Sequence, residues 1–237
     1  MTTAPPTEVD LEQHQDQQRK TLNALRFAVV PGQAAVAGSV AVVSLLAKDL
    51  LGGSDRLAGL GGAAFTLGAA AVSIPLAAFM RRRGRRPGLI LALLGGAVGA
   101  GIAATGGQVR WFWLFVVGMF VFGSGQAATL QARYVAADLA RDQDRARAIG
   151  AIVWIGTLGA VIGPVFTPIE KDVGIWLGLD EHIGPYLFAG ALFALGALVY
   201  WLRHRPDPLV LNAATDPHAR RTHPITQVRH SYRVIRA

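Results

Sequence analysis

The chain has 237 residues, of which 52% are hydrophobic and only 16% are charged, and its formal net charge is +8. This composition is too apolar and too poor in charge for an ordinary soluble domain, so it indicates a membrane protein. Nucleic acid is excluded as a partner because the basic residues fall in short clusters between apolar segments, and the lack of cysteine excludes disulfides and cysteine-based metal or redox sites.

Six apolar segments are long enough to cross the hydrocarbon layer of a bilayer, about 30 Å, as helices. They are too long and too continuously apolar to be strands of a barrel. The predicted spans cover residues 25–46, 57–79, 88–105, 111–130, 149–166 and 185–202. A polar segment, 1–24, precedes them and a basic tail, 203–237, follows them. The sequence therefore predicts an all-α membrane domain over residues 25–202, whose first span is uncleaved and acts as its own insertion signal.

Lysine and arginine set the predicted orientation, because short loops rich in these residues stay in the cytoplasm. With the amino terminus inside, the inner segments hold 19 of the 23 basic residues, and the outer loops hold only Lys48, Arg56, Arg110 and Lys171. This predicts a multi-pass protein of the plasma (inner) membrane with both termini in the cytoplasm. The arginines between residues 81 and 86 and the basic tail further predict contact with anionic lipid at the inner face.

The predicted loop between spans two and three resembles a motif of the major facilitator superfamily, G-x-x-x-D-R-x-G-R-[RK], which those transporters carry at this position. The residues that match are Arg82, Gly84, Arg85 and Arg86. Ala77 stands in place of the first glycine and Arg81 in place of the aspartate. In the family this loop latches the two halves of the transporter together in the outward-facing state. The residues alone also predict a tight turn at Gly84 and Pro87.

Span four carries a polar stripe, because Gln126, Thr129 and Arg133 recur at spacings of three and four residues. Such a stripe favours a cavity wall for a small-molecule substrate, together with Gln33 of span one and Thr157 of span five. Helix packing through interhelical hydrogen bonds is the alternative, and Arg133 could instead reach the inner interface. The run from span four into span five also resembles the family's pattern there.

In span five, Gly159 and Gly163 predict a close helix approach, and Pro164 predicts a bend. This segment resembles the family's G-x-x-x-G-P-x-x-G-G signature of drug and proton antiporters, with Thr167 and Pro168 in place of the last two glycines. The resemblance implies efflux. Proton antiporters need a carboxylate in the membrane, and the predicted spans contain none. The candidates are therefore Asp138, at the inner end of span four, or a residue of a missing second half.

Enzyme chemistry is not expected. Ser124 lies between glycines, but no histidine occurs in any predicted span to act as its base. No histidine or carboxylate cluster suggests a metal site, and no motif suggests a cofactor.

The family resemblance implies six helices arranged as two inverted three-helix units, which is the amino-terminal half of a major facilitator fold. Full members carry twelve or more spans and rock two halves around a central substrate site. Three interpretations stay open. The favoured one is a fragment of an efflux-type transporter that works by alternating access. The chain could instead be a half-transporter that pairs with itself or with a separate second half, or a non-transporting scaffold or regulator.

Overall fold

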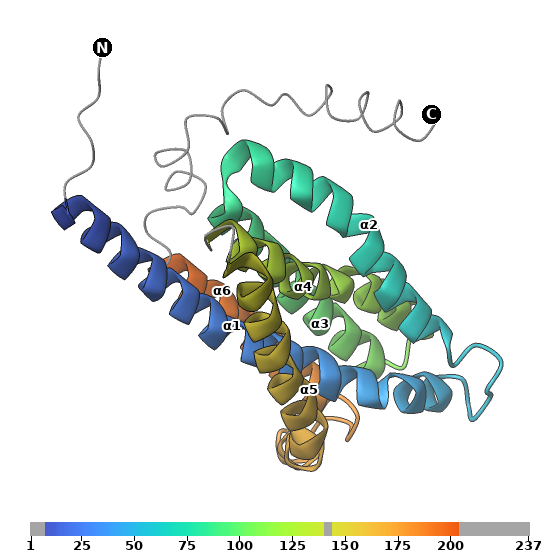
Figure 1. Cartoon of the computed structure of the whole chain (residues 1–237). Helices are drawn as coiled ribbons and strands as arrows, with labels where there is room; N and C mark the ends of the chain where they lie inside the picture. Colours follow the sequence, from blue (N-terminus) through green and yellow to red (C-terminus); the bar gives the residue numbers. More distant parts are fainter. Residues whose placement is uncertain (1–7, 140–143, 204–237) are drawn as a thin grey trace, which may run out of the picture.

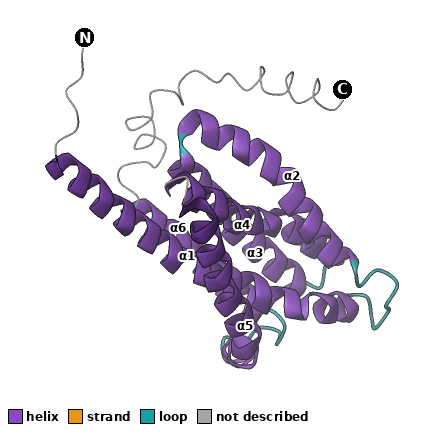
Figure 2. Cartoon of the chain, viewed as in Figure 1, coloured by secondary structure: helices purple, strands orange, loops and turns teal. Residues whose placement is uncertain are grey.

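The computed structural model describes residues 8–139 and 144–203, and its regular structure there is entirely helical (Figures 1 and 2). Each of its six helices contains a segment long and apolar enough to cross a membrane, so the prediction of six spans is confirmed. The predicted tail lies outside the described residues from 204 onward. The helices are α1 Glu8–Leu50, α2 Leu60–Arg83, α3 Arg85–Gln108, α4 Phe112–Leu139, α5 Arg145–Trp176 and α6 Gly184–Arg203.

The turn between α2 and α3 consists of one residue, Gly84. Its φ of 100° lies in the region that favours glycine, and its N–H donates to the Met80 carbonyl at 3.0 Å. Helix α3 begins at once, with Pro87 in its first turn, where a missing N–H removes no intrahelical bond. A side chain at Gly88 would meet Met80, since its Cβ would lie 2.3 Å from Cγ. The predicted tight turn is therefore shorter than expected.

Helix α5 extends ten residues beyond the predicted end of the span at 166. It runs through Pro164 and Pro168 to Trp176, so most of the predicted outer loop is helical. Membrane helices tolerate proline where neighbouring helices hold the segment in place. The buried face of α5 continues past both prolines to Gly174, which packs against Gly184 at the start of α6. This packing accounts for the extra turns.

The six helices form two three-helix units, α1–α3 and α4–α6, that pack in the same pattern. Helix α1 packs against α5 as α4 packs against α2, and α6 packs against α1 as α3 packs against α4. Helices α3 and α6 contact each other across the two units (Figure 1). Because each unit has three spans, the second starts from the opposite membrane face and is inverted relative to the first. The predicted half of a major facilitator fold matches this arrangement.

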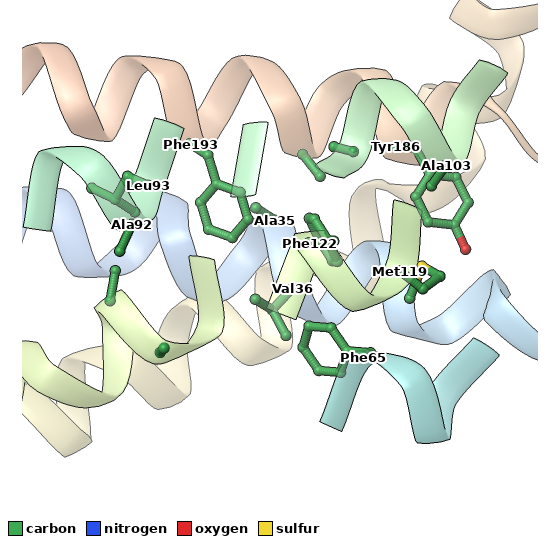
Figure 3. Packing of buried hydrophobic residues seen from close by; sticks show 14 of the residues in the cluster. Ala35, Val36, Phe65, Ala92, Leu93, Ala103, Met119, Phe122, Tyr186 and Phe193 are labelled. Carbon is green, nitrogen blue, oxygen red and sulfur yellow. The ribbon is translucent and has the colours of Figure 1, made fainter. Parts of the chain in front are cut away.

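Aromatic rings fill the centre between the units (Figure 3). The Phe122 ring of α4 lies 5.3 Å from Phe193 of α6, 5.5 Å from Phe65 of α2 and 6.5 Å from Tyr186 of α6, measured between ring centroids. Nearby, the Ser124 hydroxyl donates to the Ala92 carbonyl of α3 at 3.1 Å. Ser124 therefore joins two helices, and its hydroxyl is used for packing.

Several pairs of helices cross so closely that only glycine fits between their backbones, and two of these pairs, α2–α4 and α1–α5, correspond to each other in the two units. In the α2–α4 seam, a Cβ on Gly68 would lie 1.8 Å from the Phe120 carbonyl oxygen, and one on Gly123 would lie 2.4 Å from that of Phe65. The α1–α5 seam is built in the same way. There, a Cβ on Gly159 or Gly163 would lie 2.5 Å from a carbonyl oxygen of α1. These two seams fix how each unit packs on the other.

Candidate functional site

The polar residues of α4 lie where this helix meets α1. Thr129 is buried, and a Cβ built on Gly32 of α1 would lie 2.8 Å from the Thr129 methyl group. The Thr129 hydroxyl lies 2.8 Å from the Gln126 backbone carbonyl and 3.1 Å from the Gln126 side-chain oxygen. Gln126 is half-buried. The pair is thus held in a fixed arrangement beside α1.

The next residue of α1, Gln33, faces α5. A Cβ on Gly156 would lie 3.4 Å from Gln33 Cγ, and a Cβ on Gly159 would lie 2.9 Å from Gln33 Cβ. Because Gly32 and Gln33 are consecutive, the contacts to α4 and α5 sit at one level of α1. We call Gln33, Gln126 and Thr129 the polar band; it combines two amides and a hydroxyl in otherwise apolar helices, which suits orientation of a small molecule by a few hydrogen bonds.

The other predicted cavity residues are placed differently. Arg133 is half-buried one turn beyond Thr129 and makes no hydrogen bond or ion pair to another described residue. Thr157 is exposed, and its hydroxyl donates to the Trp154 carbonyl of its own helix at 2.6 Å. Thr157 is therefore not part of the polar band. Asp138 lies in the last turn of α4, and its side chain is outside the described part of the structure.

The arginine motif at the turn between α2 and α3 (Arg82, Gly84, Arg85 and Arg86) contacts the second unit at one end of the bundle. Arg82 is exposed, and Arg85 places a guanidinium nitrogen 3.9 Å from the Met80 sulfur. Arg86, in the first turn of α3, donates to the carbonyls of Tyr200 and Trp201 in the last turn of α6. The last carbonyls of a helix have no intrahelical donor and attract positive charge. Arg86 thus closes the end of α6.

A second polar group, at the opposite ends of the helices, links the two units. Arg110, in the turn between α3 and α4, donates to the Asp49 carbonyl of α1 at 2.9 Å and lies 3.8 Å from the Asp180 carboxylate. His182 is buried, and its Nδ1 lies 3.2 Å from Asp49 Oδ2. These contacts hold the end of α1 against the loop that precedes α6.

The buried polar residues Gln131 and Glu170 were not predicted from the sequence. Gln131 of α4 is 8% exposed and donates to the Ser73 carbonyl of α2 at 3.5 Å. Glu170 of α5 is 4% exposed. Its position corrects the expectation that no span contains a carboxylate, because α5 extends beyond the predicted end at 166. The sequence did carry a signal, since Glu170 continues the spacing of Gly156, Gly159 and Gly163 and precedes Gly174 by four residues.

The described residues contain no group of three or more histidine, cysteine or acidic side chains that could hold a metal ion.

Residues 27–235 match the family model of the Major Facilitator Superfamily. The uncharacterized MFS-type transporter YdeG of Bacillus subtilis (strain 168) is 34% identical over 193 residues, 81% of this chain and 45% of that protein. The tetracycline resistance protein, class C, of Escherichia coli is 33% identical over 125 residues, 52% of this chain and 29% of that protein.

The fold is shared with a solved structure. The crystal structure of the human organic anion transporter MFSD10 superimposes with a TM-score of 0.60 at 19% identity, over 81% of this chain and 48% of that one. This chain thus spans about half the length of the curated relatives it matches. Members of the matched family are transporters that bind small molecules, rather than enzymes. This chain belongs to the Major Facilitator Superfamily, because the family model matches most of its sequence and its six helices form two inverted units.

Proposed function

We propose that this chain forms the amino-terminal six-span half of a transporter that moves a small molecule across the membrane by alternating access. The polar band carries this proposal. Gln33 of α1 and the pair Gln126 and Thr129 of α4 lie at one level of the bundle, and Arg133 adds a positive charge one turn away. Polar groups inside apolar helices are costly, so their presence at one level supports a binding role.

The direction we propose is efflux. It is supported by the Gly159, Gly163 and Pro164 signature in α5 and by the likeness to a tetracycline resistance protein. Antiport against protons belongs to the same proposal. The prediction that Asp138 takes part in coupling stays a prediction, and Asp138→Asn with unchanged coupling would exclude it.

A second six-span half is part of this proposal, supplied either by another polypeptide segment or by a second copy of this chain. Large apolar side chains on α2 and α5 are exposed and available for such a partner, among them Ile74, Trp154 and Val161. Alternating access needs two halves that rock around one site. A strict monomer of the 237-residue chain in mild detergent would exclude the homodimer.

We propose that the protein lies in the plasma (inner) membrane with both termini in the cytoplasm. The segments 1–24 and 203–237 would then lie on the cytoplasmic side, and the arginines near Gly84 would contact anionic lipid there. The chain has no native cysteine, so single cysteines report topology cleanly. A membrane-impermeant maleimide on intact cells should label Asp55→Cys and not Arg82→Cys. Labelling of the second variant alone would reverse the orientation.

The decisive experiment is a transport assay on cells that lack their own drug pumps, with tetracycline and ethidium as probes. Cells that express the chain should accumulate less of at least one probe than cells with an empty vector. Gln126→Ala and Gln33→Ala should each restore accumulation, because they remove hydrogen-bonding groups from the polar band. The matched control is Thr66→Val, since the Thr66 hydroxyl is exposed and bonded only to its own helix, at the Gly62 carbonyl.

Equal accumulation with and without the chain would contradict transport of these probes by the chain alone. A scaffold or regulator would give the same result whether or not a second half is co-expressed. A transporter half would gain activity on co-expression with a second six-span half, and that activity would again depend on Gln126.

A further inference from the structure

The outer part of the α1–α5 seam contains a buried carboxyl group with no partner. Glu170 is 4% exposed, and its Oε2 atom has no hydrogen-bond partner. A Cβ built on Gly38 of α1 would lie 3.3 Å from Oε2 and 3.6 Å from Oε1, so the carboxyl group points at the α1 backbone. The other buried residues of α5 are Ile152 and the glycines at 156, 159, 163 and 174.

No neighbouring element offers this carboxyl group a counter-charge. Residues 27–47 of α1 and 111–132 of α4 contain no charged side chain, and α6 has none from Gly184 to Leu202. In α5 the next residues, Lys171 and Asp172, are half-buried and exposed. In the α5–α6 loop, Asp180, Glu181 and His182 interact with one another and with Asp49 and Arg110. None of these groups bonds to Glu170 among the described residues.

The amino terminus of α6 lies beside Glu170 but donates nothing to its side chain. A Cβ on Gly184 would overlap the Glu170 backbone carbonyl. Pro185 has no N–H, and the N–H groups of Tyr186 and Leu187 already donate to the Ile183 carbonyl. Helix amino termini usually stabilise a nearby carboxylate. Here Pro185 lacks the donor, and the N–H groups of Tyr186 and Leu187 are used elsewhere.

From this geometry we propose that Glu170 is a proton-binding site that controls the packing of α1 against α5. An ionised carboxylate is far more costly to bury without a partner than a protonated carboxyl group. The packed seam therefore belongs to the protonated form. Loss of the proton leaves a carboxylate that must gain water or a cation, and α1 and α5 then separate near Gly38. The inference goes beyond transport itself, since it requires neither a particular substrate nor a direction.

The first test detects the proton directly. Infrared difference spectra of the purified 237-residue chain, reconstituted in lipid, would be recorded across about pH 5 to 9. The carbonyl band of a protonated, poorly hydrogen-bonded carboxyl group should be present at the acidic end and be lost as pH rises. Glu170→Gln should abolish this band. Asp172→Asn, which changes an exposed acid two residues away, should leave it unchanged.

The second test measures the seam. Nitroxide labels on Val40→Cys and Ile169→Cys, both exposed positions beside the contact, report the separation of α1 and α5 near Glu170. The distance distribution should shift to longer values as pH rises, and Glu170→Gln should hold the short distance at every pH. The Asp172→Asn background should keep the pH response of the original chain.

Two results would overturn the proposal. One is the absence of a carboxyl band that depends on Glu170 at any pH, which would mean that the group is always ionised and partnered. The other is a pH-independent distance between α1 and α5 while the band titrates, which would mean that the proton does not act on the seam. Neither readout uses transport, so a failure here is distinct from a failure of the proposed function.

Discussion

The two seams solve the same packing problem but differ in what they bury beside their glycines. In the α2–α4 seam the buried amide of Gln131 is satisfied, since it donates to the Ser73 carbonyl. In the α1–α5 seam the buried carboxyl group of Glu170 faces the α1 backbone, and Oε2 has no partner. Each seam joins one helix of the first unit to one helix of the second, and the two seams correspond to each other under the inversion. Each can therefore be compared directly with the other.

The comparison separates what packing requires from what it does not. Gly68 and Gly163 are each needed because a carbonyl oxygen of the crossing helix occupies the place of a side chain. A carboxyl group is not needed, because the α2–α4 seam packs equally closely with an amide that has a partner. Unpartnered buried polar groups destabilise a protein, so Glu170 is retained at a cost to stability. A role outside packing is the explanation that the difference supports.

The largest expected effect on stability comes from adding a side chain at a seam glycine, where the crossing helix leaves no room for it. Gly68→Ala places a methyl group 1.8 Å from the Phe120 carbonyl oxygen, and Gly163→Ala places one 2.5 Å from that of Ala34. The helices must move apart, so we expect losses of about 3 and about 1–2 kcal/mol in the free energy of unfolding, in line with overpacked cores. Thermal unfolding in detergent, followed by tryptophan fluorescence, measures both.

Each variant has a control in its own helix. Gly62 of α2 and Gly150 of α5 have no atom within 4 Å of an added Cβ. Gly62→Ala and Gly150→Ala should therefore be neutral or slightly stabilising, since alanine favours helix. If Gly68→Ala and Gly62→Ala unfold at the same temperature, the α2–α4 seam is not a close backbone contact.

A smaller effect is expected at the link between α3 and α6. Arg86→Ala removes the donors to the Tyr200 and Trp201 carbonyls and leaves the end of α6 without a cap from α3. Because this site is partly exposed to solvent, we expect a loss of about 1 kcal/mol. Arg82→Ala, at an exposed arginine four residues earlier, should change the stability by much less. Equal losses would assign the effect to net charge at this end of the bundle.

The fold was largely predictable from the sequence because length and hydropathy act locally. Each of the six spans was found within a few residues of at least one end, and half of a major facilitator fold was expected from the family resemblance. The predicted end of span five, at 166, was wrong for a physical reason. Pro164 and Pro168 end a helix in water, but the glycine face that continues to Gly174 packs on neighbouring helices, and this tertiary contact cannot be seen in local propensity.

The candidate site was predictable in part. The spacing of Gln126 and Thr129 indicated a shared helix face, and the structure adds their contact with α1 through Gly32. Thr157 has a hydroxyl as well, but its side chain is exposed. It was predicted wrongly because the sequence does not tell which face of α5 is buried. Glu170 lies four residues beyond the predicted end of span five at 166, so the sequence did not place it in a span. Its burial depends on where α1 crosses α5, which is a property of the assembled bundle.

The smallest expected effect tests whether the satisfied amide matters to the α2–α4 seam. Gln131→Leu keeps the volume of the side chain and removes the donor to the Ser73 carbonyl, which lies 3.5 Å away and two residues before Pro75 in α2. Hydrogen bonds between membrane helices contribute about 0.6 kcal/mol on average, so the loss should be of that size. Thr105→Val is the control, because the Thr105 hydroxyl bonds only to Gly101 of its own helix. A loss several times larger would mean that the amide, rather than Gly68 and Gly123, holds α4 against α2, and the likeness of the two seams would then rest on glycine in only one of them.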